Sequence, residues 1–431
     1  MEIDKTINIL KQFILSIDLS GTPGQDLSSG FFFSTEDGGI ILNREEVDQY
    51  EQCLQGIREA LPNKELLSKK ALEKMLQRAI ILSLDPENKN TIKTRGKRTA
   101  KALMELKSDL LSAPRKFNIY YPVENLEIDN SPLIIGNVTF CIFDKKELRK
   151  FYSTISDSLQ EKEKSIRMSL FDDLQNDALF NRPVAFINVE AVDSDAAKVI
   201  AHDELQKTLD VINFFVDLVF GKGVFVYIPG NCNKTLITVP MIIDGEKGGF
   251  AIMNERSQPL FPLNLNQFVE KCRQRNLGLI RAGELLKSTK NKFEERLFAA
   301  ISWAGRATIE IQKEQAFLLY AIALETIILC DNDRDELNYR LTLRLAHLIG
   351  KEPNEGEEPI LRKKVVKKAK DLYIARSQIV HTGNYHVTDA ELYEIRQMTK
   401  LSILHILNLD PFISIQNTDE LREWFDNEIL K

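Results

Sequence analysis

The sequence predicts an α+β protein in which a mixed N-terminal region of helices and strands is followed by a C-terminal all-α helical bundle. Apolar residues recur at helical spacing over residues 1–112, short β-rich runs replace them up to residue 256, and helical spacing returns after residue 265. A chain of 431 residues has room for two or three domains. We therefore expect a mostly helical region over 1–112, an α+β sensor or binding domain over 113–256 and the bundle over 265–431.

The composition is that of a globular chain, since 43% of the residues are hydrophobic and 28% are charged. It excludes disordered, collagen-like and disulfide-stapled proteins, and the net charge of −6 excludes a nucleic-acid coat that is basic throughout. The five cysteines form no CxxC pair, and the N-terminal residues lack the apolar core of a signal sequence. No uncharged apolar run approaches the ~20 residues of a membrane span. We expect a cytoplasmic protein with reduced thiols, no metal site, no cofactor and no membrane contact.

The N-terminal region begins with an amphipathic segment and continues with a longer helical pattern through Glu45–Leu84. Between them, Phe31–Leu42 carries two apolar runs around an Asp-Gly-Gly turn, which is typical of a β-hairpin. Further on, Lys89–Lys116 holds nine basic and two acidic residues. This stretch could grip RNA or DNA, but no aromatic residue interleaves before Phe117, so a mobile basic loop leading into a helix is the simpler interpretation.

The middle region contains short runs that are rich in β-branched and aromatic residues and bounded by Gly, Pro or Asn, which predict strands. These runs are Asn118–Ile128, Leu133–Phe143, Pro183–Val192, Gly223–Pro229 and Thr235–Ile243. A helix over Ala196–Phe220 interrupts them. Two prolines in Arg256–Asn264 mark the boundary with the bundle.

The bundle is predicted from apolar residues at helical spacing together with start and stop signals. Gly383 follows the fifth helix and is expected to end it. The predicted helices are Asn266–Leu286, Lys292–Ile311, Glu314–Cys330, Glu336–Ile349, Pro359–His381 and Asp389–Asn408.

Two charged residues occupy apolar positions in this bundle. Arg376 lies about 40° around its helix from the apolar Leu372, and Glu325 interrupts the apolar stripe of Glu314–Cys330. Because a buried charge is costly unless it is paired, we expect the two side chains to meet, or Arg376 to face a cleft between subunits. The pair is either part of a functional site or a purely structural ion pair. If the side chains meet, Glu325→Ala lowers stability by a few kcal/mol.

His381 follows Arg376 by five residues, which places it about 140° away on an ideal helix. The two residues share a site only if the helix ends near His381 or if a second chain completes the site. The same helix carries a run of lysines against one acidic residue, Asp371, which fits a groove for an anionic backbone as well as an ordinary solvated face. The lysines are Lys363, Lys364, Lys367, Lys368 and Lys370.

Three segments of the bundle resemble the HEPN superfamily (higher eukaryotes and prokaryotes nucleotide-binding), and in particular the ApeA-like HEPN domains of bacterial defence proteins. They are QAFLLYAIALETIILC at Gln315–Cys330, LTLRLAHLIG at Leu341–Gly350 and DLYIARSQIVHTG at Asp371–Gly383. The resemblance covers Phe293–Leu409, about a quarter of the chain. It rests on the order of the helices together with the ALE and RSxIVH strings.

The resemblance implies a metal-independent RNA endonuclease that acts as a homodimer through its bundle. Arg376, Ser377 and His381 match the family motif of an arginine, a polar residue, a short spacer and a histidine. His381 would take the proton from a ribose 2′-hydroxyl or protonate the leaving 5′-oxygen, Arg376 would hold the charge on the phosphate, and the product would carry a 2′,3′-cyclic phosphate. The implied setting is anti-phage defence by abortive infection, with the N-terminal region binding a phage or cellular trigger.

Short motifs also match by chance, so alternatives stay open. Arg340 with His347 is a second match at a longer spacing, but LRLAHLIG has the pattern of a helix interior with no helix stop after the histidine. A HEPN bundle can also be a non-catalytic module for dimerisation or partner binding. A third possibility is the toxin of a HEPN toxin–antitoxin pair.

Overall fold

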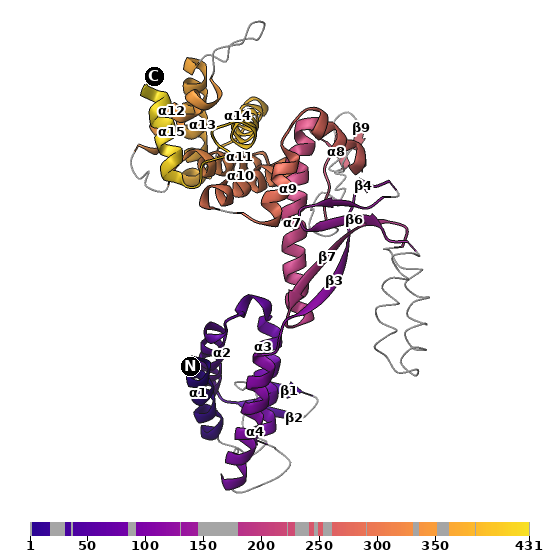
Figure 1. Cartoon of the computed structure of the whole chain (residues 1–431), viewed down its shortest axis with the longest axis vertical. Coiled ribbons are helices and arrows are strands. Elements are labelled where there is room, and N and C mark those ends of the chain that lie inside the picture. The colour runs from indigo at the N-terminus through magenta and orange to yellow at the C-terminus, as the bar shows by residue number, and fades with distance from the viewer. Residues whose placement is uncertain are drawn as a thin grey trace. The chain divides into compact units, whose positions relative to one another are not determined.

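The computed structural model describes residues 2–17, 31–35, 38–84, 92–129, 131–144, 180–221, 223–228, 241–244, 249–252, 261–289, 291–330, 336–350, 362–383 and 385–430. The chain forms two compact units, coloured along the sequence in Figure 1. The first unit is Met1–Ile119 with Asn188–His202, and the second is Tyr120–Ile187 with Asp203–Lys431. Each unit is described by itself.

The described part of the first unit consists of helices and a two-stranded hairpin. Its elements are α1 (Glu2–Ser16), β1 (Phe31–Thr35), β2 (Gly38–Leu42), α2 (Arg44–Ala60), the 3-10 turn η1 (Lys64–Leu66), α3 (Lys69–Leu84) and α4 (Ile92–Leu110). Helices α1, α2, α3 and α4 pack around buried aliphatic side chains that include Leu10, Ile57, Leu76 and Ile80. Strands β1 and β2 pair antiparallel from Phe31 opposite Leu42, which confirms the predicted hairpin.

Local signals explain where these helices begin and end. The Asn43 side chain accepts the Glu46 backbone N–H while the Glu46 carboxylate accepts the Asn43 N–H, so α2 starts with a capping box. The pattern through Glu45–Leu84 is split after Ala60, because Pro62 has no N–H to continue the helix. The basic stretch Lys89–Lys116 is helical from Ile92 to Leu110, in α4, and its described loop residues are 111–114.

A four-stranded sheet forms the β part of the middle region. Its strands are β3 (Arg115–Pro122), β5 (Leu133–Ile135), β6 (Val138–Ile142) and β7 (Pro183–Ala191), in the order β3-β7-β6-β5. Strand β6 pairs antiparallel with both neighbours, and the buried Phe140 lies opposite Ala185 of β7. Shorter pairs are β4 (Leu126–Glu127) with β10 (Leu263–Asn264), parallel, and β8 (Met241–Asp244) with β9 (Gly249–Ile252), antiparallel.

The long helix α7 (Ser194–Val219) follows β7 and confirms the predicted helix Ala196–Phe220. It also explains why the predicted strand Gly223–Pro229 is wrong over its described residues, where Tyr227 makes one isolated bridge to Glu124. The buried side chain of Asn213 donates to the Val226 carbonyl (2.9 Å) and accepts from the Val226 N–H (2.8 Å). A side chain of α7 therefore satisfies the backbone groups that a neighbouring strand would otherwise bind.

The C-terminal region is helical throughout its described part, as predicted, and Figure 1 shows it in orange to yellow. Its helices are α8 (Leu265–Gln274), α9 (Leu279–Lys287), α10 (Lys292–Ile309), α11 (Lys313–Ile328), α12 (Leu337–Ile349), α13 (Arg362–Thr382), α14 (Asp389–Asn408) and α15 (Thr418–Leu430). The fold class is thus α+β with a C-terminal helical bundle. The exact helix bounds matter most for α13, because it carries the predicted motif.

One predicted helix, Asn266–Leu286, is divided into α8 and α9. Asn276 and Gly278 between them have φ of 48° and 84°, the left-handed conformation that ends a helix. A Cβ atom on Gly278 would lie 2.4 Å from the Asn408 side chain, so glycine is required by the close approach of α14 as well. The sequence pattern missed this break because the apolar spacing continues across it.

Helix α11 packs against α10 and α14, and α13 packs mainly against α12. Their buried side chains include Phe293, Phe317 and Ile403. No helix in the described part of the chain combines the length and the apolar character that crossing a bilayer requires.

Candidate functional site

The ion pair predicted from helical spacing is present. Arg376 of α13 places its Nε 3.1 Å from Glu325 Oε1 of α11, and its Nη2 donates to Glu325 Oε2 at 3.2 Å. This two-point contact fixes the plane of the guanidinium. The two side chains are 29% and 22% exposed, so the pair lies at the edge of the bundle and not in its centre. Burial raises the pKa of Glu325, and Arg376 opposes that rise.

A small apolar pocket lies beside this pair, among α11, α12, α13 and α14. Besides Glu325 and Arg376, it is lined by Ala321, Leu324, Leu341, Leu345, Ala369, Leu372, Tyr373, Ile395 and Met398. Apolar surroundings keep water away from one side of the ion pair and so strengthen the attraction between the two charges.

His381 lies in the last turn of α13 and is exposed. The helix ends one residue later, where Gly383 has φ 67° and its N–H donates to the Ile379 carbonyl (3.2 Å), as predicted for a glycine stop. Because the helix continues through Thr382, Arg376 and His381 are about 140° and 7.5 Å of rise apart. One chain by itself therefore does not place the two side chains on one face.

A strip of apolar residues lies between them on α13. Val366, Tyr373 and Val380 follow one another at seven-residue spacing, so they form a nearly straight line along the helix. Val366 and Tyr373 are half-buried and Val380 is 51% exposed. On the helix, Arg376 is about 60° to one side of Tyr373 and His381 is about 80° to the other. The strip is thus bordered by both motif residues, and Ser377 lies on the His381 side.

The five candidate lysines divide into two groups, although all are exposed. Measured around α13 from His381, three of them lie within about 40° of it, and the other two lie about 100° and 140° away. The first group is Lys363, Lys367 and Lys370, and the second is Lys364 and Lys368. Lys368 pairs with Glu394 of α14, so this lysine faces that helix.

The alternative motif pair, Arg340 and His347, lies on α12. The expectation that no helix stop follows His347 is wrong, since α12 ends at Ile349 and Gly350 caps it. Burial and the nearby Arg362 lower the pKa of His347, which favours its neutral form. The side chain is partly buried near Glu428, as expected for a residue that packs the bundle.

The basic stretch of α4 also has a structural use. The guanidinium of Arg95 donates to the carbonyls of Ile14 and Ile17 (2.8 Å for Ile17), where α1 ends. Lys97 and Lys101 of the same helix are exposed. Arg95 therefore stabilises the contact between α4 and the end of α1 within the first unit.

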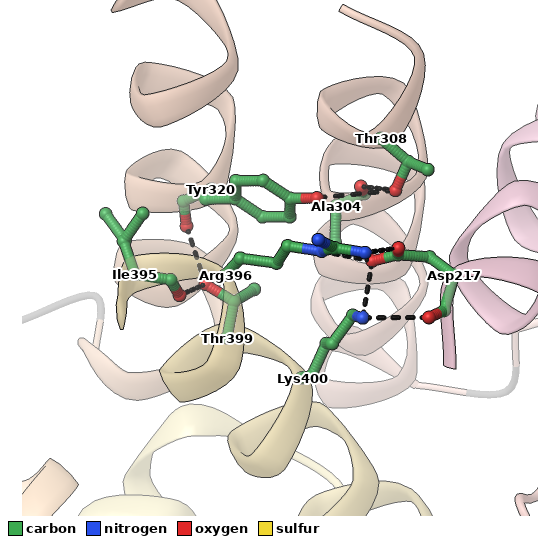
Figure 2. Close-up of polar contacts among 8 residues, drawn as sticks. All are labelled: Asp217, Ala304, Thr308, Tyr320, Ile395, Arg396, Thr399 and Lys400. Carbon is green, nitrogen blue, oxygen red and sulfur yellow. Dashed lines mark hydrogen bonds and ion pairs between the residues drawn. The ribbon is translucent and has the colours of Figure 1, made fainter. Parts of the chain in front are cut away.

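A buried charge cluster that the sequence did not predict joins α7 to α14 (Figure 2). The Asp217 carboxylate accepts from Arg396 Nε at 2.8 Å and lies 2.6 Å from Lys400 Nζ, which also donates to the Asp217 carbonyl at 2.9 Å. The three side chains are 1%, 7% and 8% exposed. Burial lowers the pKa of Lys400, and the positive charge of Arg396 lowers it further. The only signal in the sequence is the acidic residue inside the apolar run Val211–Phe220.

A second buried carboxylate on α7, Asp210, pairs with Arg306 of α10, whose Nε lies 2.7 Å from Asp210 Oδ2. Burial raises the pKa of Asp210 to about 6, and Arg306 opposes the rise. The two helices touch here, since a Cβ atom on Gly305 would lie 1.9 Å from the Asp210 carbonyl oxygen. Asp210 and Asp217 thus attach the long helix of the middle region to the bundle at two points.

Comparison with protein-family models, with curated proteins and with solved structures finds no match for this chain. Among the described residues, no group of three or more His, Cys, Asp or Glu side chains is placed to hold a metal ion. The candidate site is therefore defined by α13 and its partners: the Glu325–Arg376 pair, the apolar strip and the exposed His381.

Proposed function

We propose that this chain is a metal-independent RNA endonuclease of the HEPN type that works as a homodimer through its helical bundle. The observation that carries the proposal is the apolar strip of α13, bordered on one side by Arg376 and on the other by His381. A second copy packed on this strip would bring the motif residues of two chains to one seam. The resemblance to HEPN domains supplies the reaction.

In that reaction the ribose 2′-oxygen attacks the adjacent phosphorus, and the bond from phosphorus to the 5′-oxygen breaks. His381 takes the 2′-hydroxyl proton, or in its protonated form gives a proton to the leaving 5′-oxygen. Arg376 stabilises the negative charge that accumulates on the phosphate oxygens. The products are a 2′,3′-cyclic phosphate and a free 5′-hydroxyl.

Glu325 is a positioning residue in this scheme. It holds both donor edges of Arg376 and leaves the guanidinium only partly exposed, so the orientation of Arg376 is set before RNA binds. Ser377 lies next to the strip on the His381 side, where its hydroxyl is available for a hydrogen bond to the substrate.

The proposal requires a dimer, because a single chain does not place Arg376 and His381 on one face. Helix α13 exposes Val380 by 51%, beside the half-buried Tyr373 on the same strip. Burying such side chains drives association, because it removes apolar surface from water. We expect Val380→Glu to convert the dimer to a monomer in sedimentation experiments and to abolish cleavage together with it.

The test of the reaction is RNA cleavage by the purified full chain in EDTA, with the fragment ends analysed. Wild-type protein should produce 2′,3′-cyclic phosphate ends, and His381→Ala should lose at least about 10²-fold of that activity, the usual contribution of an acid–base group. His386→Ala is the matched control, since His386 is also exposed and lies outside α13.

Equal activity of the two histidine variants would refute the role of His381. A stable dimer that cleaves no RNA, including total RNA and tRNA, would favour a non-catalytic binding module. Cellular toxicity that depends on His381 and is relieved by a neighbouring gene would assign the chain to a toxin–antitoxin pair. We propose that the biological setting is anti-phage defence by abortive infection, with a phage or cellular trigger recognised by the N-terminal region.

A further inference from the structure

We infer that one face of α13 is a track for a single strand of RNA, built from Lys363, Lys367 and Lys370 and leading to His381. This inference rests on the proposed ribonuclease function and deepens it, because it names the form of the substrate and the path that the strand takes. It also removes Lys364 and Lys368 from the RNA-binding surface.

The alignment of the track follows from the helical geometry of α13, which the structure shows from Arg362 to Thr382. Lys363 is 18 residues before His381, which is five full turns, so the two side chains leave the helix in the same direction. Lys370 and Lys367 deviate from that direction by about 20° and 40°. All four side chains are exposed.

The charge of this face is suited to a polyanion. Helix α13 carries one acidic residue, Asp371, against seven lysines and arginines, six of which precede it. Glu394 of α14 neutralises Lys368 on the other face and leaves the three track lysines to solvent. A row of cations of this kind binds phosphates by releasing their counterions.

The shape of the track favours one strand over a duplex. The row is straight and about 27 Å long, from 18 residues at 1.5 Å of rise each. A stacked strand advances about 3.4 Å per nucleotide, so the row accommodates up to about eight nucleotides. Ile374, 51% exposed, lies in the middle of the row and offers an apolar contact to bases, which only an unpaired strand presents.

The experiment measures binding without cleavage. A labelled 12-nucleotide RNA in which every 2′-oxygen is methylated cannot be cleaved, and its anisotropy reports binding to the full chain between 50 and 200 mM salt. The variant Lys363→Gln/Lys367→Gln alters the track. The matched control Lys364→Gln/Lys368→Gln removes the same charge from the same two turns, on the other face.

The track variant should bind about tenfold more weakly at the lowest salt, and its log–log salt slope should fall by about 1.4, which is 0.7 for each lost phosphate contact. The control should stay within twofold of the wild type. A duplex of the same sequence should bind more weakly than the single strand. Equal effects of the two variants, no effect of either, or equally tight and equally sensitive duplex binding would overturn the inference.

The same proteins separate this inference from the nuclease proposal. His381→Ala should fail to cleave unmodified RNA, whereas the contrast between the two lysine variants is measured on methylated RNA and does not depend on cleavage. If the lysine variants differ as expected but no protein cleaves RNA, the track stands and the nuclease fails. If cleavage depends on His381 while both lysine variants bind alike, the nuclease stands and the track fails.

Discussion

Replacing Asp217 by asparagine should strongly destabilise the second unit, although the substitution is isosteric. The carboxylate is 1% exposed and contacts two cations, Arg396 and Lys400, which are themselves nearly buried. The asparagine fills the same volume, so packing is retained and only the negative charge is lost. Arg396 and Lys400 then lose the counter-ion that they share.

The contacts of Asp217 and Lys400 predict different changes in the free energy of unfolding when either residue is replaced. Leaving a buried charge without its partner costs about 3–5 kcal/mol, which we expect for Asp217→Asn. Lys400→Met should instead be within about 1 kcal/mol of the wild type or more stable, because it leaves one carboxylate with one guanidinium. The reduced pKa of Lys400 agrees with this expectation, since the folded protein disfavours its ammonium form.

The assay is urea unfolding followed by tryptophan fluorescence. Both tryptophans of the chain, Trp303 and Trp424, belong to the second unit, so the signal reports the unfolding of that unit. Glu284→Gln is the control: its partner Lys287 lies 3.0 Å away with both side chains largely exposed, and the change should stay within about 0.5 kcal/mol.

The pH dependence gives a second readout from the same samples. Because the folded pKa of Lys400 lies below the ordinary value of 10.5, the unfolded chain binds this proton more readily, and wild-type stability should rise with pH toward that value. Lys400→Met should remove that part of the rise. The reasoning is refuted if Lys400→Met destabilises as much as Asp217→Asn, or if Asp217→Asn costs no more than the Glu284 control.

Four further substitutions test other contacts. Glu325→Ala should lower the free energy of unfolding by about 1–3 kcal/mol, between the values for exposed and buried pairs, because it leaves the partly buried Arg376 without a partner. The folded state binds the Asp210 proton more tightly than the unfolded chain does, since the pKa of Asp210 rises from 3.8 to about 6. The free energy of unfolding of the wild type, relative to Asp210→Asn, should therefore fall by up to about 3 kcal/mol as the pH increases from 4 to 7. Gly305→Ala should destabilise by about 1–3 kcal/mol because its Cβ meets the α7 backbone, whereas Gly96→Ala in α4, with open space around it, should stabilise by about 0.5–1 kcal/mol.

Urea unfolding measures the first three substitutions by tryptophan fluorescence, and circular dichroism follows Gly96→Ala because the tryptophans are in the other unit. A neutral Glu325→Ala would show that Arg376 needs no partner. A difference between wild type and Asp210→Asn that is independent of pH would show that Asp210 is ionised alike in both states. Stabilisation by Gly305→Ala would contradict the close approach of α7 and α10.

The sequence by itself determined much of the local structure. Alternating apolar runs around an Asp-Gly-Gly turn predicted the β1–β2 hairpin, and helical spacing predicted α11, α13 and α14 close to their observed bounds. The misplaced charges of Glu325 and Arg376 predicted their own contact, because each occupied an apolar position and a buried charge needs a partner. These inferences depend on residues that are close in the sequence, or on the free-energy cost of burying an unpaired charge.

Other features were decided only by the tertiary structure. Asn213 replaces a strand partner for Val226, and side chains of α14 approach Gly278 so closely that a Cβ atom has no room there. Asp217 contacts Arg396, which lies 179 positions further along the chain, and no rule of residue spacing predicts such a contact. The spacing of apolar residues indicates which face of a helix or strand is buried, but not which segment packs against that face. The partners of buried polar groups are chosen by packing between distant segments, so they can be identified only after the chain has folded.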